Sequence, residues 1–158
     1  MKTWMFAAFL LISQGALAAN QVKLYVSLSP AGSFEAVSEK MKGNLVKQNG
    51  NFSADKLTVS VESFKTGIEL RDEHFWKHMK SSRITMSNVK GSAGKGTGVL
   101  EINGVKKPVT MAYVEKGSDL TATFNVKPSE FKLQKAQYLG VGVNDDVKVE
   151  ATYSFVTK

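Results

Sequence analysis

The stretch VKVEATYSF, residues 147–155, shows the pattern that decides the fold. Every second residue is apolar or aromatic, and the residues between them are polar or charged. Because successive side chains of a β-strand point to opposite faces, this alternation predicts a strand with one buried and one wet face. The same alternation recurs in VKLYVSL (22–28), KLTVSVES (56–63) and LTATFNV (120–126).

Weaker alternation extends this reading to about eight or nine short strands. The additional segments are SFEAVSE, GNLVKQ, RITMSNVK, GTGVLEI and KPVTMAYVE. Asn-Gly pairs at 49–50 and 103–104 predict tight hairpins, and VNDDV (143–147) predicts a turn before the last strand. Such strands predict an antiparallel sheet that closes into a barrel or a sandwich.

One segment, TGIELRDEHFWKHM (66–79), departs from the alternation. Acidic residues gather in its first half and basic residues in its second, an order that suits a helix dipole. Thr66 is the nearest candidate for an N-cap. The pattern predicts a short helix over residues 68–80 that packs on or plugs the sheet.

The N-terminus and the composition indicate an exported protein. Residues 1–18 combine Lys2, an apolar run and small residues, which is typical of a secretory signal peptide; residues 19–158 then form one domain. The apolar run is shorter than the roughly 20 residues of a membrane-spanning helix, and no later segment reaches that length. The chain has no cysteine and a formal charge of +7. Export disfavours nucleic acid as a partner, and the scattered lysines indicate a solvated face.

The sequence offers weak candidates for metal binding and catalysis. His74 and His78 are spaced to face the same side of a helix, but the residues between them lack the glutamate of zinc proteases. Asp145 and Asp146 fall in the predicted turn, where a structural role is favoured. No pattern indicates a nucleophile with its base. We therefore expect no metal, no cofactor and no enzymatic activity.

Arg71 and Asp72 leave two roles open. They are candidates for an ion pair that fixes the entry to the helix, and Arg71 is alternatively a contact for a polar head group. The sequence also leaves two alternatives for the interior of the barrel. A barrel of about eight strands is either packed solid or holds one small ligand, and the pattern alone does not choose.

Three signatures resemble those of YceI-like proteins: SVESFKTGIELRDEHF (60–75), GVLEINGVKKPVTM (98–111), and FNVKPSEFKLQ with GVGVNDDVKVEATY (124–153). The resemblance implies an all-β fold, a closed antiparallel lipocalin-like barrel of about eight strands with one short helical insertion. It also implies export to the periplasm and binding of a polyisoprenoid, including quinones with an isoprenoid tail, in the interior.

The leading hypothesis is thus a periplasmic, non-enzymatic carrier that sequesters an isoprenoid-type lipid. Strand parity and the helix give candidate ligand-binding residues, among which Tyr113 or Tyr153 could bond a head group and Phe75 and Trp76 could cover one end. The full set is Met86, Met111, Tyr113, Phe124, Tyr153, Phe155, Phe75 and Trp76. The alternative is a secreted interaction protein with a filled barrel, whose basic surface binds an anionic partner. The sequence does not indicate the oligomeric state.

Overall fold

The computed structural model describes residues 20–134, 137–138 and 140–158. The predicted signal peptide lies outside the described residues. Within them, no helix is long and apolar enough to span a membrane.

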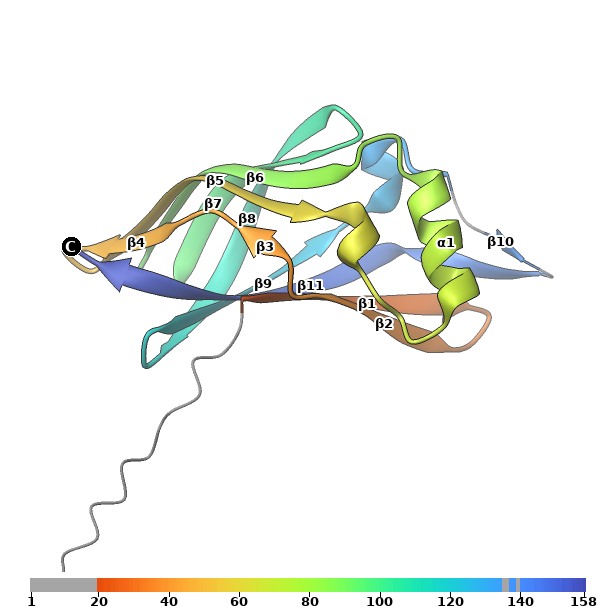
Figure 1. Cartoon of the computed structure of the whole chain (residues 1–158), viewed down its shortest axis with the longest axis horizontal. Coiled ribbons are helices and arrows are strands. Elements are labelled where there is room, and N and C mark those ends of the chain that lie inside the picture. The colour runs from red at the N-terminus through yellow and green to blue at the C-terminus, as the bar shows by residue number, and fades with distance from the viewer. Residues whose placement is uncertain (1–19, 135–136, 139) are drawn as a thin grey trace, which may run out of the picture.

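The described residues form eleven strands in one sheet, with one α-helix and two short 3-10 helices (Figure 1). The first half of the chain contains β1 (Gln21–Ser29), β2 (Ser33–Ser38), β3 (Met41–Lys42), β4 (Leu45–Gln48), β5 (Asn51–Ser60), η1 (Val61–Ser63) and α1 (Glu69–His78). The second half contains β6 (Arg83–Ser92), β7 (Lys95–Ile102), β8 (Val105–Lys116), β9 (Asp119–Val126), η2 (Pro128–Phe131), β10 (Gln137–Tyr138) and β11 (Val141–Thr157).

Seven of these strands close into a barrel, which confirms the predicted fold class. The ring runs β4-β5-β6-β7-β8-β9-β11, and β11 joins both ends. One edge of β11 pairs with β9 in antiparallel register, from Val147–Val126 to Ser154–Asp119. Its other edge pairs with β1 and then, beyond the end of β1, with β4. The β4–β11 pair is parallel and is the one departure from the expected antiparallel pairing. It forms because β11 is longer than β1, and the part of β11 beyond β1 pairs with β4, which runs in the same direction.

The β1–β2 hairpin, η1 and α1 complete the wall beside this ring. A backbone bridge between Val37 and Lys65 ties β2 to the segment that follows η1, with both N–H···O distances at 2.9 Å.

The predicted strand over 56–63 is too long, since the extended backbone ends at Ser60. Ser63 Oγ donates to the Ser60 carbonyl, and this local bond favours the 3-10 turn over further pairing. Figure 1 shows α1 across one end of the barrel, with the C-terminus at the other.

Turn chemistry explains the hairpins. The Asn49–Gly50 and Asn103–Gly104 pairs both have positive φ, which is the two-residue hairpin turn that these sequences predict. The predicted turn at 143–147 is wrong. This segment belongs to β11, where the pairing with β1 shifts register between Val26 and Leu28, so the extra residues form a bulge and the strand continues.

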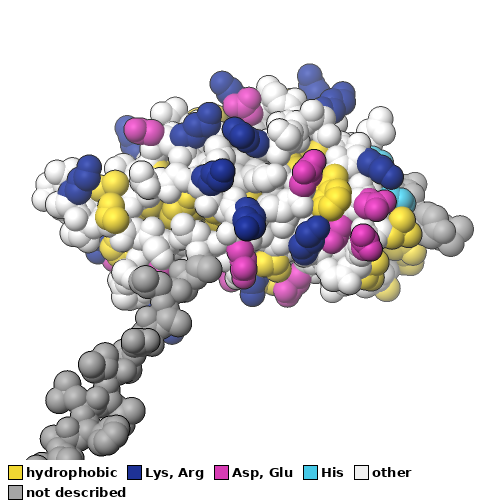
Figure 2. All heavy atoms as spheres, viewed as in Figure 1, with side chains coloured by type: hydrophobic (Ala, Val, Ile, Leu, Met, Phe, Trp, Pro, Cys, Tyr) yellow, Lys and Arg dark blue, Asp and Glu magenta, His cyan; other side chains and the backbone are white. Residues whose placement is uncertain are grey.

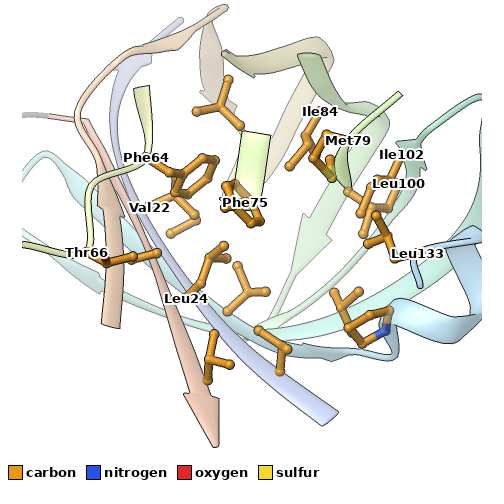
Figure 3. Close-up of a pocket in the computed structure, with 18 of the residues that line it drawn as sticks. Val22, Leu24, Phe64, Thr66, Phe75, Met79, Ile84, Leu100, Ile102 and Leu133 are labelled. Carbon is orange, nitrogen blue, oxygen red and sulfur yellow. The ribbon is translucent and has the colours of Figure 1, made fainter. Parts of the chain in front are cut away.

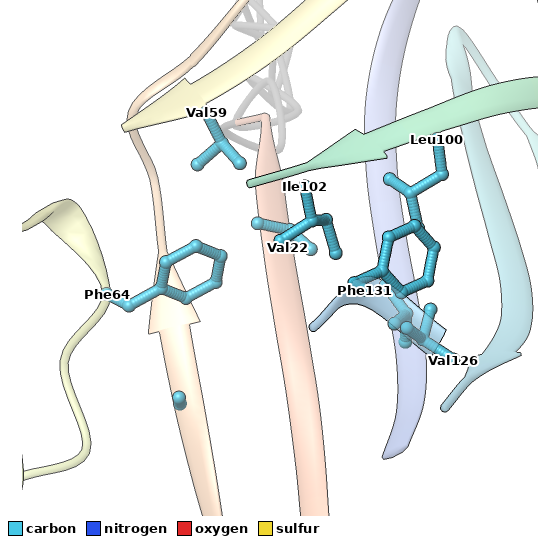
Figure 4. Packing of buried hydrophobic residues seen from close by; sticks show 9 residues of the cluster. Val22, Val59, Phe64, Leu100, Ile102, Val126 and Phe131 are labelled. Atoms are coloured by element: carbon cyan, nitrogen blue, oxygen red, sulfur yellow. The ribbon is translucent and has the colours of Figure 1, made fainter. Parts of the chain in front are cut away.

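Two clusters of buried side chains fill different parts of the barrel. One, towards α1 and η2, is centred on Phe64, Leu100, Ile102 and Phe131 (Figure 4). The other, towards the C-terminus, contains Phe52 and four further buried leucine and tyrosine residues. These are Leu45, Tyr113, Leu120 and Tyr153.

Candidate functional site

The barrel encloses a cavity of about 1040 Å³. Its wall is almost entirely apolar, and every long strand contributes to it. Figure 3 shows Phe64 and Phe75 directed into this space on one side and Leu24 on another. The volume lies at the upper end of the roughly 300–1,000 Å³ typical of ligand pockets. The geometry suits one extended apolar molecule.

Glycines on the inner face of β7 help to keep this space open. Gly96 and Gly98 occupy positions that alternate with the inward Leu100. A Cβ at Gly98 would lie 2.8 Å from the sulfur of Met86, and one at Gly96 would lie 3.0 Å from Met111 Cγ. Both methionines therefore lie flat against bare backbone, where a larger residue would push them into the cavity.

Aromatic side chains close the end of the barrel away from α1. The Phe52 ring meets Tyr113 and Phe155 edge to face, with centroids 5.3 and 4.9 Å apart. Lys47 covers this group, with its Nζ 5.4 Å from the centre of the Phe52 ring. This end is filled by side chains, which leaves one end of the cavity for entry.

The opening lies at the end that carries α1. The cavity-lining residues that are also exposed come from α1 and its N-cap, from the η2–β11 connection and from the start of β11. They include the polar residues His74, His78, Gln134 and Asn144. The β1–β2 tip borders the same opening through Leu28 and Phe34. The mouth thus carries both polar groups and exposed apolar side chains, whereas the interior is almost entirely apolar.

Helix α1 is fixed at the mouth by contacts at both ends. The buried carboxylate of Asp72 accepts hydrogen bonds from the Thr66 N–H and Oγ1, at 2.8 and 2.7 Å. Asp72 therefore does not need the predicted ion pair with Arg71, whose guanidinium stacks 4.3 Å from the Phe34 ring centre. Beyond the helix, Asn103 Oδ1 accepts the backbone N–H of Lys80 at 2.8 Å.

The short helix η2 fills a gap in the wall. Strands β8 and β9 pair only from Ala112–Thr123 to Lys116–Asp119, next to the turn that joins them. The rest of β9 diverges from β8. Phe131 of η2 is 2% exposed and packs where the strands have separated (Figure 4). Asp145 accepts hydrogen bonds from the Ser129 N–H, at 2.8 Å, and from its hydroxyl. This bond fastens η2 to β11 and accounts for one of the paired carboxylates seen in the sequence.

Five of the eight predicted ligand-binding residues line the cavity. They are Phe75, Met86, Met111, Phe124 and Tyr153. The Tyr153 hydroxyl, considered for a head group, donates to the Gly43 carbonyl at 3.1 Å. Burial raises the pKa of Tyr153 above its usual 10.0, so the phenol stays neutral.

The other three predicted residues do not line the cavity. Tyr113 and Phe155 face inward, as the alternation along their strands requires. They lie at the closed end of the barrel, where both rings pack against Phe52. Trp76 follows the inward Phe75 on α1 and turns to the helix flank, where Lys65 Nζ lies 4.5 Å from its ring centre. Sequence reasoning missed Gly96, Gly98 and Leu133; the two glycines inside a strand pattern are the signal that could have indicated close packing.

The residues of the site suit the binding of an apolar ligand better than they suit metal binding or catalysis. In the described part of the chain, no three His, Cys, Asp or Glu side chains are placed to hold a metal ion. His74 and His78 lie exposed on α1 at the mouth. An apolar cavity that opens at one end, with polar groups at its mouth, can accommodate an apolar molecule with one polar end.

Fold and cavity together define a β-barrel of the ligand-holding kind. A family model described as the YceI-like domain matches residues 14–155. The chain therefore belongs to the YceI-like family, as its motifs predicted.

Solved structures show the same fold. BcnA of Burkholderia cenocepacia matches with a TM-score of 0.64 and 19% identity, over 84% of this chain and 94% of that one. A polyisoprenoid-binding domain from Saccharophagus degradans, implicated in plant cell wall breakdown, matches with a TM-score of 0.62 and 12% identity, over 87% and 94%. No curated protein sequence matches the chain.

Proposed function

We propose that the protein binds and carries a polyisoprenoid or isoprenoid quinone, with the tail in the cavity and the head group at the mouth. The observation that carries this proposal is the apolar cavity of about 1040 Å³, closed at one end by aromatic side chains. The name of the Saccharophagus degradans domain, which has the same fold, supports the choice of ligand.

The driving force is removal of the tail from water. Burial of apolar groups contributes about 0.8 kcal/mol per CH₂, so each isoprene unit contributes about 4 kcal/mol before ordering costs. Met86 and Met111 line the inner part of the cavity, and their flexible side chains adapt to an irregular, methyl-branched chain. The tail, rather than the head group, should therefore dominate the affinity.

The mouth contains groups that suit a polar head. Arg71, His74 and Gln134 border the opening and supply hydrogen-bond donors for a quinone carbonyl or another acceptor. Nothing in this arrangement requires bond breaking, so the proposed role is binding without catalysis.

The alternative with a filled barrel is less well supported, because the interior contains a large cavity. The basic charge remains a property of the surface: lysines and acidic residues alternate on the face seen in Figure 2. We also propose that the carrier acts in the periplasm, on the strength of the signal-peptide pattern in residues 1–18.

Binding of related ligands to lipid-free protein tests the proposal. The ligands are an isoprenoid quinone, a polyprenol with the same tail, and the quinone ring without a tail, each added from a water-miscible solvent. We expect the first two to bind tightly and the ring alone to bind weakly or not at all. Equal binding of the tailless ring would refute a tail-driven mechanism.

A further inference from the structure

The exposed apolar side chains of this barrel are concentrated at its two ends. In the described residues, five large apolar side chains are clearly exposed, at 38% or more. Three of them, Ile68 (50%), Leu70 (64%) and Val141 (38%), also line the cavity. The other two, Val114 (68%) and Val156 (57%), do not. We call the first three the apolar rim.

The apolar rim comes from separate segments that meet at the mouth. Ile68 and Leu70 belong to the start of α1, and Val141 opens β11. Figure 1 shows both elements at the same end of the molecule, and Figure 2 shows hydrophobic side chains beside the histidines there. The rim is therefore continuous with the apolar wall of the cavity, and an oily chain that leaves the cavity passes over it.

Local packing does not explain these exposures. Ile68 is the N-cap residue and makes no side-chain capping bond, while its backbone carbonyl already accepts the N–H groups of Arg71 and Asp72 at 3.0 and 3.1 Å. Leu70 is the most exposed residue of the rim, although the inward face of the same helix carries Phe75 and Met79. Apolar side chains at these positions gain free energy only when something covers the mouth.

The charges at the mouth favour a neutral membrane surface over an anionic one. Helix α1 carries Glu69, Asp72 and Glu73 against Arg71 and Lys77, and Lys65 and Lys80 flank it in the sequence. The Lys77 Nζ lies 3.7 Å from Glu73 Oε2. This balance gives no strong field of either sign, so insertion of apolar side chains must supply the affinity.

We propose that the apolar rim docks the mouth of the barrel onto a lipid bilayer, so that the ligand passes between membrane and cavity without entering water. This inference rests on the proposed function. The bilayer is the occupant that the observations favour, because the rim is apolar, nearly neutral and continuous with a cavity that suits a membrane-soluble chain.

Sedimentation with ligand-free phosphatidylcholine vesicles tests the docking. We expect the wild-type protein to bind these vesicles. The triple variant Ile68→Thr, Leu70→Gln, Val141→Thr should bind them with an affinity at least about tenfold lower, since membrane affinity scales with the apolar area inserted. The matched control is Val114→Thr with Val156→Thr at the opposite end, which should bind like the wild type. Sodium chloride should leave the binding unchanged.

A second measurement does not depend on the folding of the triple variant. The chain has no cysteine, so Leu70→Cys and Val114→Cys each accept one polarity-sensitive fluorophore. Vesicles should shift the emission of the probe at position 70 to the blue and leave that at position 114 unchanged. No shift at position 70, equal shifts at both, or binding that requires anionic lipid and disappears in salt would overturn the docking.

The outcomes also separate this inference from the proposed function. A wild-type protein that binds the isoprenoid quinone from solvent but ignores vesicles would overturn the docking and leave the carrier function standing. A protein that sediments with vesicles through the rim but binds no isoprenoid would support the docking and refute the ligand.

Discussion

The substitution Ala151→Phe should block ligand binding while the protein stays folded. Ala151 faces the cavity from β11, between Val22 of β1 and Ala122 of β9. A phenyl ring there enters the middle of the space now open to a ligand and displaces about one isoprene unit. Such a unit contributes about 4 kcal/mol of burial, and part of this is offset by the ordering of the chain.

The expected loss of affinity follows from these values. Since about 1.4 kcal/mol corresponds to a tenfold change, we expect the Kd for an isoprenoid quinone to rise by about a hundredfold. The ligand-free protein should be as stable as the wild type in urea or more stable, because the ring buries its surface in an existing cavity. Isothermal titration and urea unfolding measure the two quantities.

A matched control distinguishes blocking from general damage. Ala112 lies on β8, faces solvent and does not line the cavity. Ala112→Phe therefore adds the same ring to the outside of the wall and should leave the Kd unchanged. Quinone binding by Ala151→Phe that equals that of the wild type, or an equal loss of binding in Ala112→Phe, would refute the proposed position of the tail.

Three further predictions concern the structure around the site. Tyr153→Phe removes the bond to the Gly43 carbonyl and should cost about 1 kcal/mol near neutral pH. Because burial raises the pKa of Tyr153 above 10.0, the wild type should also lose stability as the pH rises from about 10 through the folded-state pKa, and the variant should lack this component in urea titrations. Asp72→Ala should cost about 2–4 kcal/mol and speed hydrogen exchange in α1, whereas Asp72→Asn, which keeps an acceptor for Thr66, should cost less. Phe131→Ala should cost about 3–5 kcal/mol in urea unfolding, because the side chain is 2% exposed.

Each of these has a result that contradicts it. A variant Tyr153→Phe with the same alkaline loss as the wild type would assign that loss to other groups. Equal effects of the two Asp72 substitutions would mean that the Thr66 bonds contribute little. A loss below about 1 kcal/mol for Phe131→Ala would show that η2 is not needed to seal the wall.

The alternation of apolar and polar residues predicted which face of each strand points inward. On β11, Val147, Val149 and Tyr153 are buried as VKVEATYSF indicates, and on β8 Met111 and Tyr113 face inward. Parity follows from one local rule, so it needs no knowledge of the partner strands. The Asn-Gly hairpins were equally predictable because the turn itself demands those residues.

The alternation of apolar and polar residues did not predict where each inward side chain lies along the barrel axis. Tyr113 and Phe155 point inward but lie at the closed end, a position set by the stagger of all the strands in the ring. The position of Trp76 outside the cavity lining has another cause. The rotation of α1 about its axis depends on the packing of Phe75 against Phe64, whose ring centroids are 5.7 Å apart. The two-residue strands β3 and β10 are too short to show an alternation.

We propose that the interior of this barrel holds an isoprenoid tail. Native mass spectrometry of the protein purified from its own cells without detergent, followed by extraction and identification of any bound lipid, tests it most directly. We expect one isoprenoid molecule per chain in the wild type and none in Ala151→Phe. A wild-type protein that carries no lipid, and that gains no mass when incubated with isoprenoid quinone or polyprenol, would contradict it.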